Sequence, residues 1–308
     1  MNRIFAIAGP TASGKTALGV KVAQHFGGEV VNFDSVQIYR GIEIATAKPS
    51  DEEKQGIPHH LIGYVDPNVN YTASDWAKDA TAKILEIEGR GKTVVLVGGT
   101  GFYLRSLLEP IFEGDKPDQS FRDRLHRIAG LRGKDHLHRM LRRLDPAAAE
   151  LIPPGNLVRV VRALEVYFQT GKPFTEVRRE RPEPPEFARR VGLFVLGPPR
   201  EVLYKRINRR TVEHFEGGLV EEVKHLLERG VKDDTNALGA HGYRRVCELL
   251  RGDRTLESAI ELSQQNVRNY AKRQLTWYRK HEKAIWLDGF GDEDRVWREF
   301  LEKTAELG

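Results

Sequence analysis

The residues from Gly9 to Thr16 have the types and spacing of a loop that binds phosphate groups. The segment fits the pattern G-x-x-x-x-G-K-[ST] and directly follows an apolar run. In such a loop, glycines let backbone N–H groups turn toward phosphate oxygens, and the lysine adds positive charge. The residues predicted to bind a diphosphate are Gly9, Thr11, Ala12, Ser13, Gly14, Lys15 and Thr16, and the Thr16 hydroxyl is the predicted Mg²⁺ ligand. The loop alone does not distinguish a nucleoside triphosphate from a prenyl diphosphate.

A glycine-rich turn, Gly98-Gly99-Thr100-Gly101, follows the apolar run 93–97. P-loop ATPases place an acidic residue at the end of a buried strand to hold Mg²⁺, and no acid stands at this strand end. The glycines predict a tight turn that brings the backbone and the Thr100 hydroxyl close to a ligand, although a simple strand-to-helix turn is the alternative. This feature argues against an ordinary ATPase.

Asp34 follows another apolar run, at residues 29–33. At the carboxyl end of a parallel strand it would lie where open α/β sheets bind ligands. There it could accept a proton from a nucleophile or order the water shell of a metal. Capping a helix N-terminus is an equally suitable role for an aspartate, and both interpretations stay open at this point.

The phosphate loop, Thr100 and Asp34 must be positioned by regular secondary structure, and the chain has the sequence pattern of a parallel sheet. Short β-branched runs alternate with helical patterns, which predicts an α/β fold: a P-loop NTPase-like parallel sheet flanked by helices. Strands are expected at 3–8, 29–33, 93–97, 192–196 and 284–287, and helices at 15–26, 74–89 and 200–210. The Arg-, Leu- and Ala-rich stretch 115–185 predicts an all-helical insertion domain between core segments 1–114 and 186–308, and the prolines at 182–185 mark the return to the core.

Composition limits the class of protein. The 308 residues carry a net charge of +5, are 40% hydrophobic and contain one cysteine, Cys247. A single cysteine excludes an internal disulfide and a multi-cysteine zinc site. No apolar run approaches the ~18 residues that span a bilayer, so a cytoplasmic location without membrane contact is expected. Residues 1–113 have a net charge of −2 and the remainder +7, which fits either a polyanion-binding region or solvated helices.

With these motifs in hand, the chain strongly resembles the bacterial tRNA dimethylallyltransferases from Ile4 to about Arg279. Further motifs that carry the resemblance are Thr46-Ala47-Lys48-Pro49, Pro58-His59-His60-Leu61, Arg159-Val160-Val161-Arg162-Ala163-Leu164-Glu165 and Tyr270-Ala271-Lys272-Arg273-Gln274. The resemblance implies a P-loop core with a helical insertion, Mg²⁺ as cofactor, and two substrates, dimethylallyl diphosphate and the anticodon stem-loop of a tRNA. The dimethylallyl group would go to the exocyclic N6 amine of the adenosine immediately 3′ of the anticodon. A monomer is the default expectation.

The resemblance also assigns roles to residues. It implies Asp34 as general base, Thr100 as a group that orients the amine or a phosphate oxygen, and Arg210, with Arg206 second, as the arginine on the leaving diphosphate. The residues that it implies for tRNA contact are Ser35, Val36, Gln37, Arg122, Arg159, Val160, Val161, Arg162, Ala163, Gly239, Ala240, His241, Gly242, Tyr243 and Arg244. His241 departs from the family pattern, in which an aliphatic residue is commoner.

Two other groups of residues have open interpretations. Arg268, Lys272, Leu275 and Arg279 share one helix face, which suits an RNA backbone or a solvated surface. The pair His59 and His60 lacks further metal ligands at useful spacing and is expected to be structural.

Two rival functions remain from the sequence: a small-molecule kinase that uses ATP at the same loop, and a non-catalytic RNA-binding protein with a nucleotide switch. The glycine turn and the basic helical remainder argue against the first. The missing strand-end carboxylate argues against the second.

Overall fold

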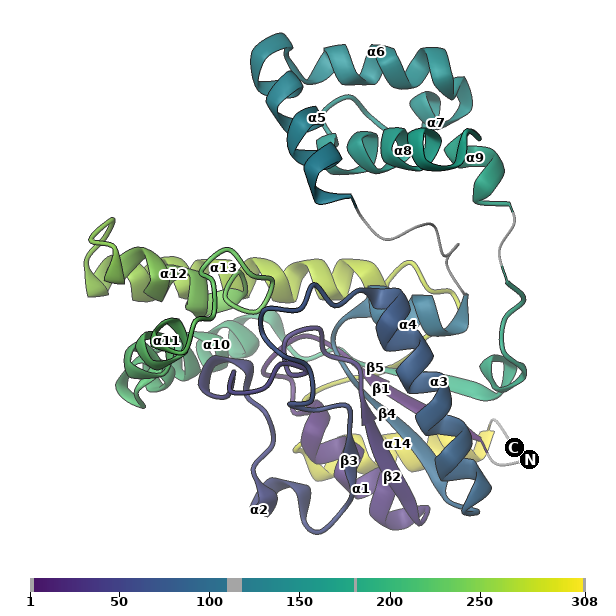
Figure 1. The fold of residues 1–308 in the computed structure, drawn as a ribbon. Coiled ribbons are helices and arrows are strands. Elements are labelled where there is room, and N and C mark those ends of the chain that lie inside the picture. Colours follow the sequence, from purple (N-terminus) through teal and green to yellow (C-terminus); the bar gives the residue numbers. More distant parts are fainter. Residues whose placement is uncertain (1–2, 110–117, 180–181, 307–308) are drawn as a thin grey trace. The chain divides into compact units, whose positions relative to one another are not determined.

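The computed structural model describes residues 3–109, 118–179 and 182–306, and the chain divides into two compact units (Figure 1). Unit 1 comprises Met1–Leu108 and Pro185–Gly308, and unit 2 comprises Glu109–Pro184. Within the described ranges, no helix combines the length and the apolar character needed to cross a membrane.

Unit 1 is organised around a parallel sheet. Its described strands are β1 (Ile4–Ala8), β2 (Gly28–Asn32), β3 (His59–His60), β4 (Thr93–Gly98), β5 (Val191–Leu196) and β6 (Ile285–Leu287). They are hydrogen-bonded in the order β3-β2-β4-β1-β5-β6, and each pair is parallel. The phosphate loop that follows β1 therefore leaves from the interior of the sheet. The predicted fold class, a parallel sheet flanked by helices, is confirmed.

Helices cover both faces of this sheet (Figure 1). The described helices of unit 1 are α1 (Lys15–His25), η1 (Ile44–Thr46), α2 (Asp51–Lys54), α3 (Ala73–Gly89), α4 (Gly101–Leu108), η2 (Glu186–Arg190), α10 (Arg200–Glu216), α11 (Leu219–Glu228), α12 (His241–Leu250), α13 (Leu256–Tyr278) and α14 (Asp294–Glu306). Side chains alternate along β1: Phe5 and Ile7 pack with α1 and α14, while Ile4, Ala6 and Ala8 pack with α3, α4 and the helices from α10 to α13. Both faces of β1 are thus buried, as its continuous apolar run requires.

Helix α10 ends at Glu216, six residues beyond the predicted end at Arg210. Buried residues recur at every fourth position from Leu203 to Phe215, so the helical pattern continues through the arginine-rich segment. The predicted helix ended at Arg210 because the many polar residues in this segment made the four-residue spacing of the buried side chains hard to recognise. The helix ends where Gly217 follows.

Strand β3 was not predicted, because two residues give no periodic signal. It forms an edge of the sheet, where it pairs with β2. His60 Nε2 lies 2.7 Å from Glu29 Oε2, and Arg90 Nη2 lies 2.6 Å from the same oxygen. No cluster of three or more potential metal-ligating side chains occurs in the part of the chain that the structure describes. His60 and Arg90 thus share the Glu29 carboxylate at this edge.

Unit 2 is helical throughout its described elements (Figure 1). These are α5 (Gln119–Arg132), α6 (Lys134–Leu144), α7 (Pro146–Leu151), α8 (Leu157–Thr170) and α9 (Phe174–Val177). They enclose an apolar core of their own, with Leu125, Leu137, Leu141 and Leu164 among its buried side chains. Unit 2 therefore has the internal packing of a small helical domain.

A buried carboxylate organises one side of unit 2. Glu165 on α8 is fully buried, and it accepts hydrogen bonds from Arg122 Nε at 2.9 Å, Arg122 Nη2 at 2.8 Å and Arg162 Nη1 at 2.6 Å. It also accepts the backbone N–H of Asp118 at 2.9 Å. Burial alone would raise the pKa of Glu165, but the two arginines lower that pKa below its ordinary value. The cluster joins the start of α5 to the middle of α8.

Replacing Glu165 with glutamine is expected to lower the unfolding free energy by about 2–3 kcal/mol, because both guanidinium groups lose their carboxylate. Since the pKa of Glu165 is lower in the folded state, its stabilisation is complete above the ordinary carboxyl pKa. It is lost as the pH falls through the folded value. Urea unfolding of the full chain at neutral and acidic pH measures both effects, with Glu150→Gln on α7, an exposed carboxylate, as the matched control. Equal stability of the Glu165 and Glu150 variants would contradict the prediction.

Candidate active site

The phosphate loop joins β1 to the N-terminus of α1. Gly14 precedes that helix with φ of 82°, a conformation that favours glycine, and no side chain caps the helix. A Cβ at Gly14 would also lie 2.8 Å from the backbone nitrogen of Asp292, so packing requires glycine as well. Uncapped amides at a helix N-terminus attract anions, and this loop therefore forms an anion site.

Two basic side chains flank this loop. Lys15 Nζ donates to the Pro10 carbonyl at 2.7 Å, and Arg210 donates to the Thr11 hydroxyl. Burial lowers the pKa of Lys15 to about 8, with nearby Asp34 opposing and Arg210 assisting that shift. Burial likewise lowers the pKa of Arg210, again opposed by Asp34. The site thus holds two desolvated cations, which a bound diphosphate would stabilise.

Arg206, the second predicted arginine, has a different partner. Its Nη1 lies 3.0 Å from both carboxylate oxygens of Asp292, and its guanidinium stacks over the Phe290 ring at 3.7 Å from the centroid. It lines the same cavity as Arg210 but is held by the segment before α14. The structure therefore separates the two arginines by their contacts, which favours Arg210 as the direct phosphate ligand.

Asp34 lies just beyond the end of β2, as its position in the sequence predicts. Its Oδ1 accepts the backbone N–H groups of Val36 at 2.9 Å and Gln37 at 3.3 Å, so the aspartate caps the turn that follows. Among the described residues, no hydrogen bond to Oδ2 occurs. The residue also lines the cavity, where its charge acts on Lys15 and Arg210. The two alternatives left open by the sequence are compatible, because one oxygen caps and the other remains available.

Thr100 lies between β4 and α4. Its Oγ1 accepts the backbone N–H of Ser35 at 3.0 Å and donates to Ser35 Oγ at 3.2 Å, which ties it to the turn beside Asp34. The flanking glycines serve protein packing rather than ligand approach: a Cβ at Gly99 would lie 2.1 Å from Gln274 Nε2, and one at Gly101 would lie 2.2 Å from the Trp277 ring. The turn is tight, as predicted, but its closest neighbours belong to α13.

Gln274 on α13 was not predicted to have a role in the site. Its Oε1 accepts the Thr11 N–H at 2.9 Å, and its Nε2 donates to the Gly99 carbonyl at 3.0 Å. This buried amide therefore joins the phosphate loop to the glycine turn. The signal was present in the sequence, because Gln274 ends one of the motifs that carry the resemblance.

The phosphate loop, Asp34, Arg206, Arg210 and Gln274 line a cavity of about 320 Å³ within unit 1, whereas Thr100 is not among the lining residues. One part of its lining is polar and consists of the phosphate loop, Asp34, Gln37 and Arg210, while Phe215, Leu219 and Val267 supply apolar surface. A volume of this size suits a small ligand with a charged and an apolar end.

Some residues of the predicted RNA-contact set in unit 1 have buried side chains. Val36 and Tyr243 are buried, and the Tyr243 hydroxyl bonds to Glu222 and to the backbone of Ala45, so neither side chain forms an RNA-contact surface. Gly242 is buried as well and lines the cavity.

The other predicted contacts in unit 1 lie closer to the surface. Ser35 and Gln37 are half-buried, Gly239 and Arg244 are exposed, and Ala240 is half-buried. Residue 241 begins α12, and its side chain lies outside the described part of the structure.

The predicted contacts in unit 2 likewise divide into buried and exposed side chains. Val160, Val161 and Ala163 are buried in its core, so their side chains are not available to RNA. Arg159 is exposed. Arg122 and Arg162 are half-buried and bind Glu165, so their first role is to stabilise the unit.

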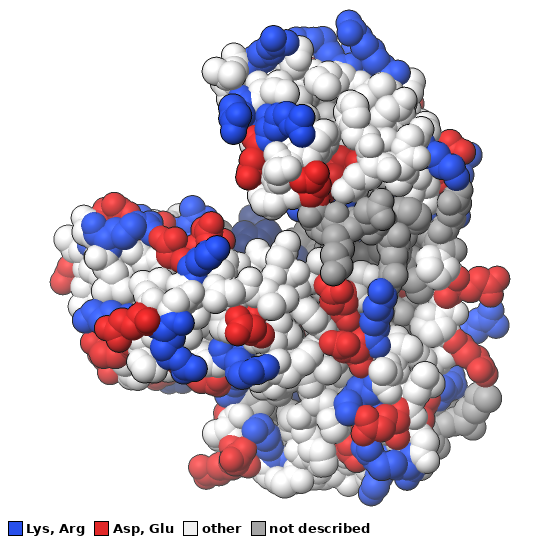
Figure 2. All heavy atoms as spheres, viewed as in Figure 1, with Lys and Arg blue, Asp and Glu red and all other residues white. Residues whose placement is uncertain are grey.

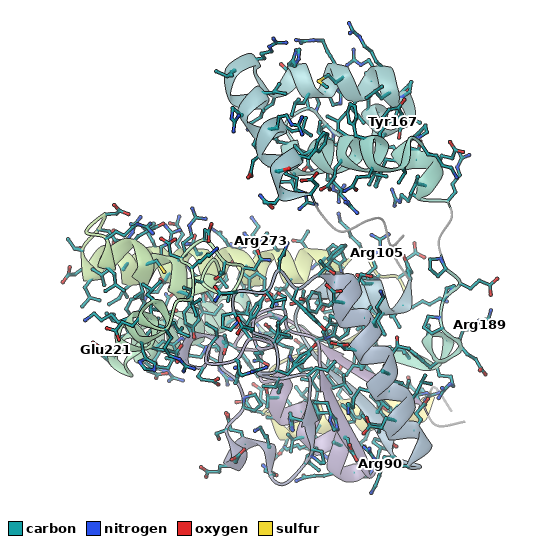
Figure 3. All side chains as sticks on the ribbon, viewed as in Figure 1. Arg90, Arg105, Tyr167, Arg189, Glu221 and Arg273 are labelled. Carbon is teal, nitrogen blue, oxygen red and sulfur yellow. The ribbon has the colours of Figure 1, made fainter. Side chains whose placement is uncertain are left out.

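Each unit by itself carries basic side chains on its surface that are candidates for RNA contact. Figure 2 shows Lys and Arg side chains spread over the visible face of the helices of unit 2. In unit 1, α4 and α13 pack together and carry Arg105 and Arg273 (Figure 3). Of the predicted stripe on α13, Lys272 and Arg279 are exposed, whereas Arg268 is half-buried and donates to Asn208 Oδ1 at 2.6 Å.

A parallel sheet with a phosphate loop, two half-buried cations and a carboxylate in one cavity defines an enzyme of the P-loop class. The IPP transferase family model matches residues 37–281, and the chain belongs to this family. It is therefore a transferase.

Comparison with individual proteins agrees with this family. The chain is 44% identical to the tRNA dimethylallyltransferase of Geobacter metallireducens, over 96% of this chain and 95% of the relative, and 46% identical to that of Geobacter sulfurreducens, over 93% and 92%. It is also similar to the crystal structure of the tRNA isopentenylpyrophosphate transferase of Bacillus halodurans, with a TM-score of 0.71 and 38% identity over 100% and 99% of the two chains. A eukaryotic dimethylallyltransferase acting on tRNA gives a TM-score of 0.79 at 28% identity, over 99% of this chain and 78% of that one.

Proposed function

We propose that the protein transfers the dimethylallyl group of dimethylallyl diphosphate to the exocyclic N6 amine of the tRNA adenosine immediately 3′ of the anticodon. The main observation in support of this proposal is that the phosphate loop and the Asp34 carboxylate line the same cavity. The names of the relatives, which include tRNA dimethylallyltransferases, support the same reaction.

The residues suit each step of this transfer. The exocyclic amine is a poor nucleophile because its lone pair is delocalised into the ring. As N6 bonds to C1 of the donor, the C1–O bond breaks, diphosphate leaves, and the N6 proton passes to Asp34. The available Oδ2 of Asp34 accepts that proton, and Thr100, which is bound to Ser35 beside Asp34, would orient the incoming amine.

Negative charge grows on the leaving diphosphate, and the site is built to stabilise it. The amides at the start of α1, Lys15 and Arg210 surround the position that phosphate oxygens would occupy. The donors are fixed before the reaction, so they need little rearrangement as charge develops.

The site also fits Mg²⁺. Thr16 lines the cavity, and in the described ranges no cluster of three protein ligands competes for a metal. Mg²⁺ favours few protein ligands together with substrate phosphates and water, so Thr16 and the diphosphate oxygens would hold it. When bound, it supplies further stabilisation of the leaving group.

The target base stacks within an anticodon loop and must leave that stack to reach the cavity. Exposed basic groups such as Arg159, Arg244 and Lys272 would hold the RNA backbone. A cytoplasmic enzyme that acts as a monomer is consistent with this proposal.

An assay with defined substrates tests the function. Purified protein, Mg²⁺, dimethylallyl diphosphate and an unmodified anticodon stem-loop should give one prenylated adenosine per RNA and one diphosphate. The same RNA with guanosine at the target position is the matched control and should stay unmodified. Brisk ATP hydrolysis with untouched RNA and allylic donor would reject the proposal.

A further inference from the structure

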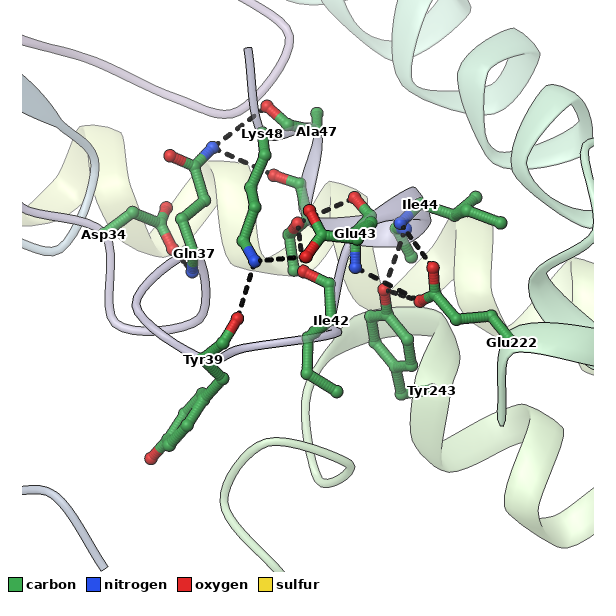
Figure 4. A network of polar contacts seen from close by, with 12 residues as sticks. Asp34, Gln37, Tyr39, Ile42, Glu43, Ile44, Ala47, Lys48, Glu222 and Tyr243 are labelled. Atoms are coloured by element: carbon green, nitrogen blue, oxygen red, sulfur yellow. Dashed lines mark hydrogen bonds and ion pairs between the residues drawn. The ribbon is translucent and has the colours of Figure 1, made fainter. Parts of the chain in front are cut away.

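One wall of the cavity is held in place by hydrogen bonds to two helices, α11 and α12. This wall segment, residues 43–47, includes η1 and contributes Ala45, Thr46 and Ala47 to the lining. Figure 4 shows its polar contacts with Glu222 on α11 and Tyr243 on α12. The segment therefore depends on partners nearly two hundred residues away in sequence.

Three consecutive backbone N–H groups of the wall segment bind these partners. Glu222 Oε1 accepts from Glu43 N at 3.2 Å and Glu222 Oε2 from Ile44 N at 3.1 Å. The Tyr243 hydroxyl accepts from Ala45 N at 3.1 Å and donates to Glu222 Oε1 at 2.6 Å. Tyr243 is completely buried, so its hydroxyl has no water to replace a lost partner.

Lys48 fixes the other end of the wall segment. Its Nζ donates to the Tyr39 carbonyl at 2.6 Å and to Glu43 Oε1 at 2.8 Å, and its side chain is 7% exposed. A buried ammonium with two such partners allows little displacement. The segment is thus secured at both ends.

A glutamine connects the wall segment to Asp34 (Figure 4). Gln37 Nε2 donates to the carbonyls of Thr46 and Ala47, each at 3.0 Å, while Gln37 N donates to Asp34 Oδ1 at 3.3 Å. The hydrogen bonds therefore run from α11 and α12 through the wall segment to the carboxylate.

We propose that Glu222 and Tyr243 are positioning residues that hold Asp34 Oδ2 toward the reacting amine through the wall segment and Gln37. This inference rests on the proposed function, in which Asp34 is the base. Within the described residues, no hydrogen bond of this network reaches the phosphate loop. Loosening the network therefore slows proton transfer and leaves the diphosphate site intact.

Tyr243→Phe tests the proposal, because it removes one hydroxyl and preserves the buried ring. We expect the single-turnover rate with saturating substrates to fall about tenfold, within the coupling range of a hydrogen-bond network, and diphosphate affinity to change less than twofold. Glu222→Gln should have a similar effect, since its single carbonyl oxygen cannot replace both carboxylate oxygens. Glu221→Gln, an exposed neighbour on α11, is the matched control.

A double-mutant cycle with Asp34→Asn identifies the route of the effect. If the network acts through Asp34, Tyr243→Phe slows the Asp34→Asn enzyme far less than it slows the original protein. Additive losses, or a lower melting temperature with an unchanged single-turnover rate, would overturn the positioning role. Near-normal turnover of Asp34→Asn alone would instead reject the proposed base.

Discussion

Asp34→Asn is expected to lower the single-turnover rate of prenyl transfer by about 10²–10⁴-fold, the usual contribution of a positioned general base. Asparagine preserves the shape of the side chain and can still accept the N–H groups of Val36 and Gln37. It cannot take a proton at the position of Oδ2. The loss should therefore appear in the chemical step, while binding of RNA and of dimethylallyl diphosphate stays within a fewfold of normal.

Rapid-quench measurement of product, together with equilibrium binding of each substrate, separates these effects. Asp66→Asn is a matched control, because Asp66 Oδ1 accepts the Asn68 N–H at 2.9 Å in a similar turn but does not line the cavity. That variant should react at a normal rate. Near-normal turnover of Asp34→Asn, or an equal loss in both variants, would show that Asp34 acts only as a cap.

Features encoded by short spacing were predictable from the sequence. The phosphate loop has a fixed residue pattern, and this pattern directly follows the apolar run of β1. Alternating strands and helices likewise predicted the parallel sheet, because hydrophobic periodicity reflects which faces are buried. The positions of Asp34 and Thr100 were predictable for the same reason, since each lies two residues beyond the end of a strand.

Features that depend on distant contacts were not predictable. Gln274 reaches Thr11 and Gly99 only after α13 packs beside the phosphate loop, and Tyr243 reaches Ala45 in the same way. A local sequence pattern does not indicate which side chains come into contact across such a distance. The resemblance to the family included the motifs that contain Gln274 and Tyr243, but it did not predict their contacts.

In the motif on α8, the residues predicted to contact RNA divide between the core and the surface of unit 2. A contiguous sequence motif was taken to contact RNA along its length, yet an α-helix turns successive residues toward different directions. Val160 and Val161 consequently face the core of unit 2, whereas Arg159 is exposed. Applying the helical period to this motif would have separated the two buried valines from the exposed arginine.

Arg210→Ala is expected to reduce the transfer rate by about 10²–10³-fold, the typical cost of removing one donor that stabilises developing negative charge. Arg210 binds Thr11 of the phosphate loop and is desolvated, so its charge acts strongly on a leaving diphosphate. Arg210→Lys should recover part of this loss, because an ammonium restores the charge but lacks the planar fork that engages two oxygens.

Arg206→Ala on the same helix is the matched control. Because Arg206 is bound to Asp292 and stacked on Phe290, its removal should cost much less, with a modest loss of stability. Single-turnover rates and inorganic pyrophosphate affinity, measured for the three variants, order the two arginines by their contribution. An Arg206→Ala loss as large as that of Arg210→Ala would mean that substrate binding breaks the Asp292 pair and brings both guanidinium groups onto the diphosphate. In that case the leaving group would be held by an arginine pair one helical turn apart, and Asp292 would compete with it for Arg206.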